Sequence, residues 1–403
     1  MNSTPASQPQ LHRPAPAASR RTPLWRDERV VRLVLQGLFL LSVGALCLYF
    51  YANVRRGLAE AGLTPSFRFL SSEAGFGISE GIRYAPSDSY GRALWVGAVN
   101  TVRVSAWGIA LATGIGLVAG IARLSSNWLV RSLAGAYIEL FRNIPLLLQL
   151  LFWYSAVFLK LPPVRQSVEV FGRIFLNRRG LYVPRLEAGP GLTTWLAFLA
   201  AGAVAALAVY LHRRRQLARL DRPGFPVLRA APVFLLFAAA GWFLAPLPPL
   251  QLDLPRLERF NFAGGARLSP EFAALLLGLS VYTGAFIAEV VRGGIQAVDK
   301  GQREAALALG LRPAAVTFLI VLPQAVRVIV PPLTNQYLNL AKNSSLAVAI
   351  GYPDLFNIGT TTMNQTGQTI PLFLIIMAGY LSLSLITSAF MNWYNRRVRL
   401  IQR

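Results

Sequence analysis

The sequence predicts an all-helical integral membrane protein with about eight transmembrane helices. Three observations lead to this prediction. The chain of 403 residues is 54% hydrophobic and only 14% charged, whereas soluble domains average about 45–50% and about 25%. Its mean hydropathy is +0.46. The apolar residues also gather in long runs that can cross a hydrocarbon core about 30 Å thick.

The apolar runs divide the chain into eight spans and the segments between them. We place the spans at residues 33–52, 93–121, 143–160, 192–211, 230–249, 272–291, 326–350 and 370–393. We expect a cytoplasmic tail (1–32), a first span with a periplasmic loop (33–92), two core parts (93–160 and 270–395), an intervening insert with two extra spans (161–269), and a basic C-terminal tail (396–403). Within the second span, Gly116 and Gly120 form a GxxxG pair that permits close helix packing.

The positions of the arginines predict the orientation, because cytoplasmic loops of membrane proteins are enriched in Lys and Arg. The N-terminal tail, the loop after the fourth span and the C-terminus are all rich in arginine, whereas residues 351–369 contain no Lys or Arg. Both termini are therefore expected in the cytoplasm. The loop 160–191 should then be external, although it holds six basic residues, and we expect it to fold as a surface helix or a re-entrant element.

Several chemistries are excluded by the residues that the chain lacks. The net charge of +23 lies mostly between apolar runs, where it indicates topology and not nucleic-acid binding. One cysteine and two histidines cannot form a zinc site of Cys and His ligands or an intrachain disulfide. None of the three lysines follows a glycine, so the chain has no phosphate-binding P-loop. If ATP is used, another chain must bind it.

The segment 293–325, between the sixth and seventh spans, carries the most informative pattern. It reads Glu-Ala-Ala, three residues, Gly310, nine residues, then Ile-x-Leu-Pro. Gly310 is suited to end one helix in the left-handed conformation, and Pro313 is suited to the first turn of the next helix. We therefore expect two short helices joined by a turn, with small alanines forming a surface on which a partner can dock. No residue in this segment suggests catalysis.

This complete EAA-x3-G-x9-I-x-L-P pattern resembles the cytoplasmic coupling motif of ABC importer permeases, the membrane subunits of binding-protein-dependent transporters. The resemblance implies the type I ABC importer permease fold and docking of the segment 297–323 on a separate ATPase subunit that binds ATP and Mg²⁺. It implies no enzyme activity and no cofactor in this chain. The coupling residues that it implies are Glu304, Ala305, Ala306, Gly310, Ile320, Leu322 and Pro323.

Three further segments are similar to those of polar amino-acid permeases of the histidine/glutamine permease family. They are 138–147 (IELFRNIPLL), 282–295 (YTGAFIAEVVRGGI) and 331–347, which contains PP, an Asn and KNSSLA. The enlarged insert is similar to the general L-amino-acid and glutamate/glutamine/aspartate/asparagine systems. This resemblance implies a multi-pass protein of the bacterial inner membrane. It also implies two ATPase subunits and a periplasmic amino-acid-binding protein. One permease chain supplies half of a pathway, so we expect a second permease subunit, either a copy of this chain or a different permease; the tail and the insert favour the heterodimer.

Polar side chains recur on one face of each of three predicted helices, and intramembrane polar residues usually face a pathway or one another. Arg142 and Lys342 are suited to an amino acid's carboxylate and Glu289 to its ammonium group. The full set of pathway candidates is Arg142, Asn143, Gln149, Tyr282, Glu289, Asn335, Asn339, Lys342, Asn343 and Ser344. Pro331 and Pro332 are expected to break or kink the seventh helix.

Five of these candidates also have a purely structural interpretation. Glu139 with Arg142, and Glu289 with Arg292, are spaced to form pairs on one helix. Lys342 can extend to the membrane interface, and Asn335 and Asn339 can join helices by hydrogen bonds. Two other functional classes remain open: an ion-gradient-driven amino-acid transporter, which leaves the EAA pattern unexplained, and a membrane scaffold without transport.

Overall fold

The computed structural model describes residues 28–60, 66–219 and 225–398, and the chain divides into two units, residues 1–66 and 67–403. In the first unit, α1 (Glu28–Glu60) contains the predicted span 33–52. A helix of this length and hydropathy can cross the hydrocarbon core of a bilayer. Most of the predicted N-terminal tail lies outside the described residues.

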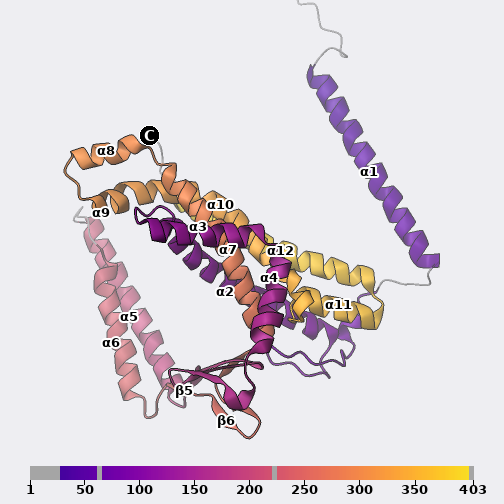
Figure 1. Ribbon diagram of the computed structural model, residues 1–403, viewed down its shortest axis with the longest axis horizontal. Helices are drawn as coiled ribbons and strands as arrows, with labels where there is room; N and C mark the ends of the chain where they lie inside the picture. The colour runs from indigo at the N-terminus through magenta and orange to yellow at the C-terminus, as the bar shows by residue number, and fades with distance from the viewer. Residues whose placement is uncertain (1–27, 61–65, 220–224, 399–403) are drawn as a thin grey trace, which may run out of the picture. The chain divides into compact units, whose positions relative to one another are not determined.

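The second unit contains a helical bundle with an outlying helical pair and a group of short strands (Figure 1). Its helices are α2 (Tyr90–Ala122), α3 (Trp128–Asn143), α4 (Leu146–Phe152), α5 (Leu192–Arg219), α6 (Val227–Leu244), α7 (Pro270–Gln296), α8 (Lys300–Ala308), α9 (Pro313–Ala315), α10 (Leu322–Asn343), α11 (Leu355–Thr366) and α12 (Thr369–Val398). In the described residues, seven helices are long and apolar enough to cross a membrane, and one bent pair supplies an eighth span. The predicted helical membrane architecture is confirmed.

Helices α2 and α7 form the most extensive helix pair of the bundle. Gly116 and Gly120 make this possible, because a Cβ at Gly116 would collide with Ile287 and one at Gly120 would lie 2.7 Å from the carbonyl oxygen of Ala288. The interpretation of the GxxxG pair as a packing element is therefore confirmed. The apolar core around this contact also includes side chains from α4 and α10.

The third predicted span begins at a sharp bend. Helix α3 and the helical segment 146–160 meet at 103°. Ile144 and Pro145, at the bend, have extended ψ angles of 127° and 136°, which end α3. The residue before a proline is biased away from the helical conformation, which explains the position of the bend.

The seventh span is longer than predicted and has no break at its two prolines. Helical residues continue from Pro313 to Ile350, with a π-helical stretch (Val316–Val321) before α10 and a 3-10 stretch (Ser344–Ile350) after it. Pro331 and Pro332 lie inside α10, which is helical on both sides of them. The expected break at this point is therefore not observed.

The two extra spans expected in the insert are present as α5 and α6, but the loop 160–191 is not the surface helix or re-entrant element that we expected. Residues 168–188 and 250–268 form short strands: β1 (Val168–Val170), β2 (Ile174–Asn177), β3 (Gly180–Val183), β4 (Arg185–Ala188), β5 (Leu250–Asp253), β6 (Arg256–Glu258), β7 (Asn261–Ala263) and β8 (Ala266–Leu268). They make a four-stranded antiparallel sheet in the order β1-β2-β3-β8 and two ribbons, β4-β5 and β6-β7. No pattern in the sequence predicts these strands, because each has only three or four residues.

Between the two groups of strands, α5 and α6 pack closely on each other as an antiparallel pair. Gly202 lies against the Cβ of Phe237, and Gly241 against that of Phe198. The indole of Trp195 donates a 2.9 Å hydrogen bond to the carbonyl of Ala238. Helix α6 ends at Leu244, five residues before the predicted limit of that span, where a proline-rich stretch follows.

Candidate functional site

The segment that matches the EAA pattern forms a tight helical turn. Asp299 caps α8 by accepting a 2.7 Å hydrogen bond from the backbone N–H of Gly301. Gly310 has φ +80°. Its N–H donates to the carbonyl of Leu307 over 2.9 Å, and the N–H of Leu311 donates to that of Ala306 over 3.2 Å. These two bonds form the Schellman motif, which ends a helix at a left-handed residue.

Most residues of the α8–α9 turn face outward. Glu304 and Ala305 are exposed, whereas Ala306 is buried. Helix α8 packs against the π-helical stretch Val316–Val321. Leu309, beside the turn, is 83% exposed. Farther along, Ile320 is half-buried, and Leu322 and Pro323 are exposed. The expected two-helix turn is confirmed in its geometry, and it presents small and apolar side chains to its surroundings.

The candidate residues of α7 form an aromatic pair and an ion pair. Tyr282 and Phe286 lie with ring centroids 5.0 Å apart. One turn farther, Arg292 donates from Nε and Nη2 to Oε2 of Glu289, at 3.0 and 2.8 Å. The structural interpretation of Glu289 and Arg292 as a pair is thus confirmed. Arg292 also donates to Gln296 over 2.7 Å, so its guanidinium is held from both sides.

On α3 and α4, the candidate residues meet α7 or support the bend. The guanidinium of Arg142 lies 5.1 Å from the ring centroid of Phe286, a cation–π geometry. Glu139, the alternative partner of Arg142, instead forms an ion pair with Arg123, whose Nη2 lies 3.7 Å from Oε1 of Glu139. Buried Gln149 donates from Nε2 to the carbonyls of Phe141 and Ile144, both at 2.9 Å, and so satisfies the end of α3.

The candidate residues of α10 lie on a surface of the chain. Asn335, Asn339 and Lys342 are all exposed, and their spacing of four and three residues places them on one face of the helix. Asn343 is half-buried, and buried Ser344 donates to the carbonyl of Ala341 over 2.8 Å. The structure thus brings Arg142 and Tyr282 to a common partner, Phe286. The exposed candidates of α10 lie together on one face of that helix.

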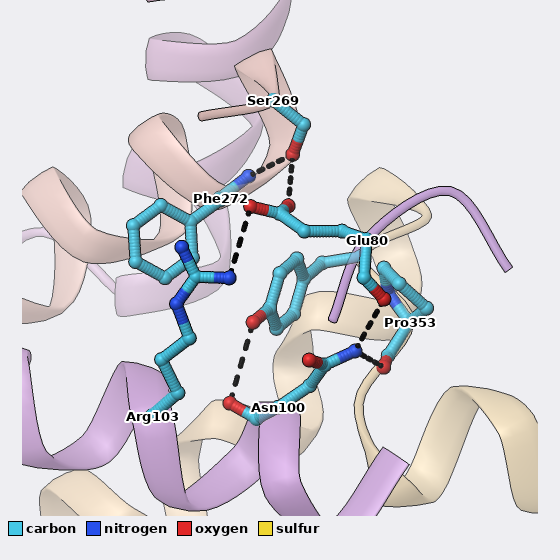
Figure 2. Close-up of polar contacts among 7 residues, drawn as sticks. Glu80, Asn100, Arg103, Ser269, Phe272 and Pro353 are labelled. Atoms are coloured by element: carbon cyan, nitrogen blue, oxygen red, sulfur yellow. Dashed lines mark hydrogen bonds and ion pairs between the residues drawn. The ribbon is translucent and has the colours of Figure 1, made fainter. Parts of the chain in front are cut away.

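A buried polar cluster lies near the β8 end of α7, where the loop before α2 crosses it (Figure 2). Ser269 caps α7 by accepting from the N–H of Phe272 over 3.0 Å, and its hydroxyl donates to Oε2 of Glu80 over 2.6 Å. Arg103 Nη1 lies 3.5 Å from Oε1 of Glu80. Burial raises the pKa of Glu80 above its usual range, because Ser269 and Arg103 offset only part of the desolvation.

Asn100 connects this cluster to a second loop. Its Nδ2 donates to the backbone carbonyls of Glu80 and Pro353, at 3.1 and 2.9 Å. The backbone carbonyl of Asn100 accepts from the hydroxyl of Tyr352 over 3.3 Å. Asp354, which follows Pro353, is fully buried and caps α11 by accepting from the N–H of Asn357 over 2.8 Å. Two loops distant in sequence are therefore fixed to the same end of α2.

This polar cluster is absent from the residues predicted from the sequence. Glu80 and Asp354 lie in polar loops, where a carboxylate is ordinarily solvated, and nothing in the local sequence indicates burial. The α7 cap, a Ser followed by Pro at the first helical position, is the one local signal that was available. Within the residues that the structure describes, no group of three or more His, Cys, Asp or Glu side chains is placed to hold a metal ion.

Comparison with known proteins explains this combination of bundle and exposed turn. Residues 198–400 match the family described as the inner membrane component of binding-protein-dependent transport systems. The chain is also 46% identical over 377 residues to a putative amino-acid ABC transporter permease, YhdX of Escherichia coli K12, covering 92% of this chain and 94% of that protein. The chain belongs to this permease family.

Other permeases resemble this one over nearly their full lengths. The general L-amino acid permease protein AapQ of Rhizobium johnstonii is 45% identical, with 87% of this chain and 88% of that protein covered. The glutamate/glutamine/aspartate/asparagine permease protein BztB of Rhodobacter capsulatus is 38% identical, with 97% and 99% covered. A crystal structure of an amino acid ABC transporter with histidines aligns with a TM-score of 0.46 and 21% identity, over 76% of this chain and 95% of that one. As a member of the family, and with seven candidate membrane spans among the described residues, the permease is a multi-pass inner-membrane component of a multi-protein transport system.

Proposed function

We propose that this permease forms one half of the translocation pathway of an ATP-driven importer of L-amino acids. Two separate ATPase subunits bind ATP and Mg²⁺, and a periplasmic binding protein delivers the amino acid. Closure of the ATPase pair around nucleotide moves the segments 297–323, and the attached helices turn the pathway from inward-facing to outward-facing. This chain transmits force and performs no bond chemistry.

One observation carries the proposal: the EAA pattern coincides with a Schellman-closed turn whose surface is exposed. Glu304, Ala305 and Leu309 are exposed, while Ala306 between them is buried. A rigid, small-residue projection of this kind can fit into a groove on another protein and pass a displacement to α7 and α10, the helices on either side. The names of YhdX, AapQ and BztB as amino-acid permeases support the same substrate class for this chain.

Pairing with a second permease follows from the exposed polar face of α10. Asn335, Asn339 and Lys342 are costly to expose to lipid, and a second subunit across a shared pathway would cover them. We propose a heterodimer, in which the insert and the N-terminal tail distinguish this half. The arginine-rich tails place both termini in the cytoplasm in this proposal.

The proposed pathway uses the cationic and amide groups of α3 and α10. Arg142 and Lys342 are suited to the substrate carboxylate, with Asn335, Asn339 and Asn343 as amide partners. Glu289 can bind the ammonium group of the substrate only when its ion pair with Arg292 is broken. The remaining pathway candidates include Ser344, Gln149 and Tyr282. The two hydrogen bonds of Gln149 stabilise the α3–α4 bend, so its first role in this scheme is structural.

The test is a mild-detergent purification of the tagged chain from its native membrane, followed by mass spectrometry and ATPase measurements. We expect an ATPase subunit and a second permease at similar stoichiometry, and ATP hydrolysis that rises when amino-acid-loaded binding protein is added. A lone chain that takes up amino acids without any ATPase would overturn the proposal and support the gradient-driven alternative. A complex with neither ATPase nor uptake would support a scaffold.

A further inference from the structure

The short strands form a layered structure at one end of α7, which we call the β platform (residues 164–188 and 250–268). Strand β8 leads directly into α7, whereas α8 follows the other end of that 27-residue helix. At 1.5 Å per residue, the two ends are about 40 Å apart. The β platform and the α8–α9 turn therefore lie on opposite sides of the bundle, as Figure 1 also shows.

The sheet has one face toward the bundle and one face away from it. Leu268 packs against the main hydrophobic core and pairs in register with Leu181. Side chains on neighbouring positions alternate between faces, so Tyr182 and its partner Phe175 point the other way. The ring of Phe262 covers both side chains, with its centroid 4.8 Å from that of Tyr182 and 4.6 Å from that of Phe175. The β6-β7 ribbon is thus an outer layer, separated from the bundle by the sheet.

The β platform is strongly basic. It holds eight arginines, all exposed, against four acidic residues. Two of the four acids are already engaged, because Asp253 accepts from the N–H of Gly265 over 2.7 Å and Glu187 lies 2.9 Å from Arg185. In the proposed orientation this charge lies on the external side, where membrane proteins have few basic residues. Topology therefore does not account for it.

The tips of two hairpins display side chains that the turns themselves disfavour. Phe171, between β1 and β2, has φ +54°, and Arg259, between β6 and β7, has φ +32°. Tight hairpins favour Asn or Gly at such positions, and an aromatic residue with positive φ is rare. Phe171 is 90% exposed. Phe260, which follows Arg259, is 71% exposed, and the guanidinium of Arg165 lies 5.5 Å from the centroid of its ring. Side chains retained against local preference and presented to solvent are typical of a recognition surface.

We infer that the β platform is a docking surface for the acidic face of the soluble binding protein, with the two hairpin tips as its contact points. This inference rests on the proposed function, which requires such a protein on the side opposite the ATPases. A protein is favoured over anionic lipid headgroups because the β6-β7 ribbon, with Arg259 at its tip, lies on the sheet face that points away from the bundle. Complementary charge would speed the encounter and fix its register.

A graded charge series at the two tips tests the inference. Arg173→Gln/Arg259→Gln and then Arg173→Glu/Arg259→Glu are introduced into the complete complex in nanodiscs. The measurement is the Kd of the purified binding protein that stimulates the wild-type complex. We expect Kd to rise about threefold for the neutral pair and about tenfold or more for the reversed pair. The differences should shrink at high salt, because exposed charges are screened. Phe171→Ser should weaken binding independently of salt.

The matched control removes two charges from the other end of the insert. Arg214→Gln/Arg215→Gln, on exposed positions of α5, should leave Kd unchanged. Basal ATP hydrolysis should be equal in all variants. A Kd that stays constant through the tip series overturns the inference, and variant effects seen only with phosphatidylglycerol in the nanodisc would assign the arginines to lipid instead. If no binding protein stimulates even the wild-type complex, the proposed function itself fails.

Discussion

The hydroxyl of Tyr380 donates a 2.7 Å hydrogen bond to Oδ2 of Asp354, while the N–H of Asn357 donates to Oδ1 over 2.8 Å. The first bond joins α12 to the loop before α11, and the second caps α11. Asp354 has no exposed surface, and its burial raises its pKa to about 6, because these hydrogen bonds offset only part of the lost hydration.

The raised pKa of Asp354 gives a signed prediction for stability. The folded protein binds this proton more tightly than the unfolded chain, in which an aspartate titrates near 3.9. The contribution of Asp354 to the free energy of unfolding therefore falls as pH rises from about 4 through about 6, and is constant above that range. Thermal unfolding in detergent should show this slope in the wild type. Asp354→Asn, which still caps α11, should unfold with a shallower pH dependence.

The companion variant Asp354→Ala separates the cap from the charge. It should unfold at a lower temperature than Asp354→Asn at every pH, because loss of an N-cap costs about 1 kcal/mol. Equal pH slopes for the wild type and Asp354→Asn would contradict the assignment of a raised pKa to this carboxyl.

Gly310 should matter through its backbone conformation alone. A Cβ at this position meets no atom within 4 Å, but φ is +80°. Gly310→Val should therefore strain the α8–α9 turn by about 1–3 kcal/mol and uncouple ATP hydrolysis from uptake. Gly310→Asn should retain coupling, since Asn tolerates this conformation. The measurement is the ratio of uptake to hydrolysis in proteoliposomes. Normal uptake by the Val variant would count against the docking role of the turn.

The close packing of α2 on α7 predicts a strong difference between two glycines of the same helix. Gly116→Val places its side chain in Ile287 and should destabilise the protein by about 1–3 kcal/mol. Gly114→Val makes the same helix-propensity change where nothing lies within 4 Å. Unfolding temperatures of the two purified variants compare them directly. Similar temperatures would mean that α2 and α7 are not in this register.

Gln149 should be required as a hydrogen-bond donor at the α3–α4 bend. Gln149→Leu leaves the carbonyls of Phe141 and Ile144 without this donor, at a cost of about 1–3 kcal/mol. Gln149→Glu has the same shape but no N–H, and should destabilise as well. Melting curves of both variants in detergent provide the measurement. Wild-type stability with an altered KM for uptake would instead assign Gln149 to the pathway.

Much of the membrane architecture could be predicted from the sequence because hydrocarbon imposes a simple rule. A helix must satisfy its own backbone and present about twenty apolar side chains, so α2, α5, α7 and α12 were predicted from apolar runs. The Schellman turn at Gly310 could also be predicted, since it depends on residues within a few positions of one another. The strands of the β platform could not, because strands of three or four residues are stabilised by contacts between residues distant in sequence, such as Tyr182 and Phe262.

The sequence by itself determined the class of the protein, the number of spans and the α8–α9 turn, because hydropathy and local backbone preferences operate over short stretches of chain. Only the tertiary structure decided which polar residues are partnered. Glu289 pairs with Arg292, Gln149 supports a bend, and Asn335 remains open on α10. It also decided that Glu80 is buried beside Ser269, across 189 residues of chain. Such contacts depend on which helices and loops pack against one another, and a local sequence pattern does not determine that packing.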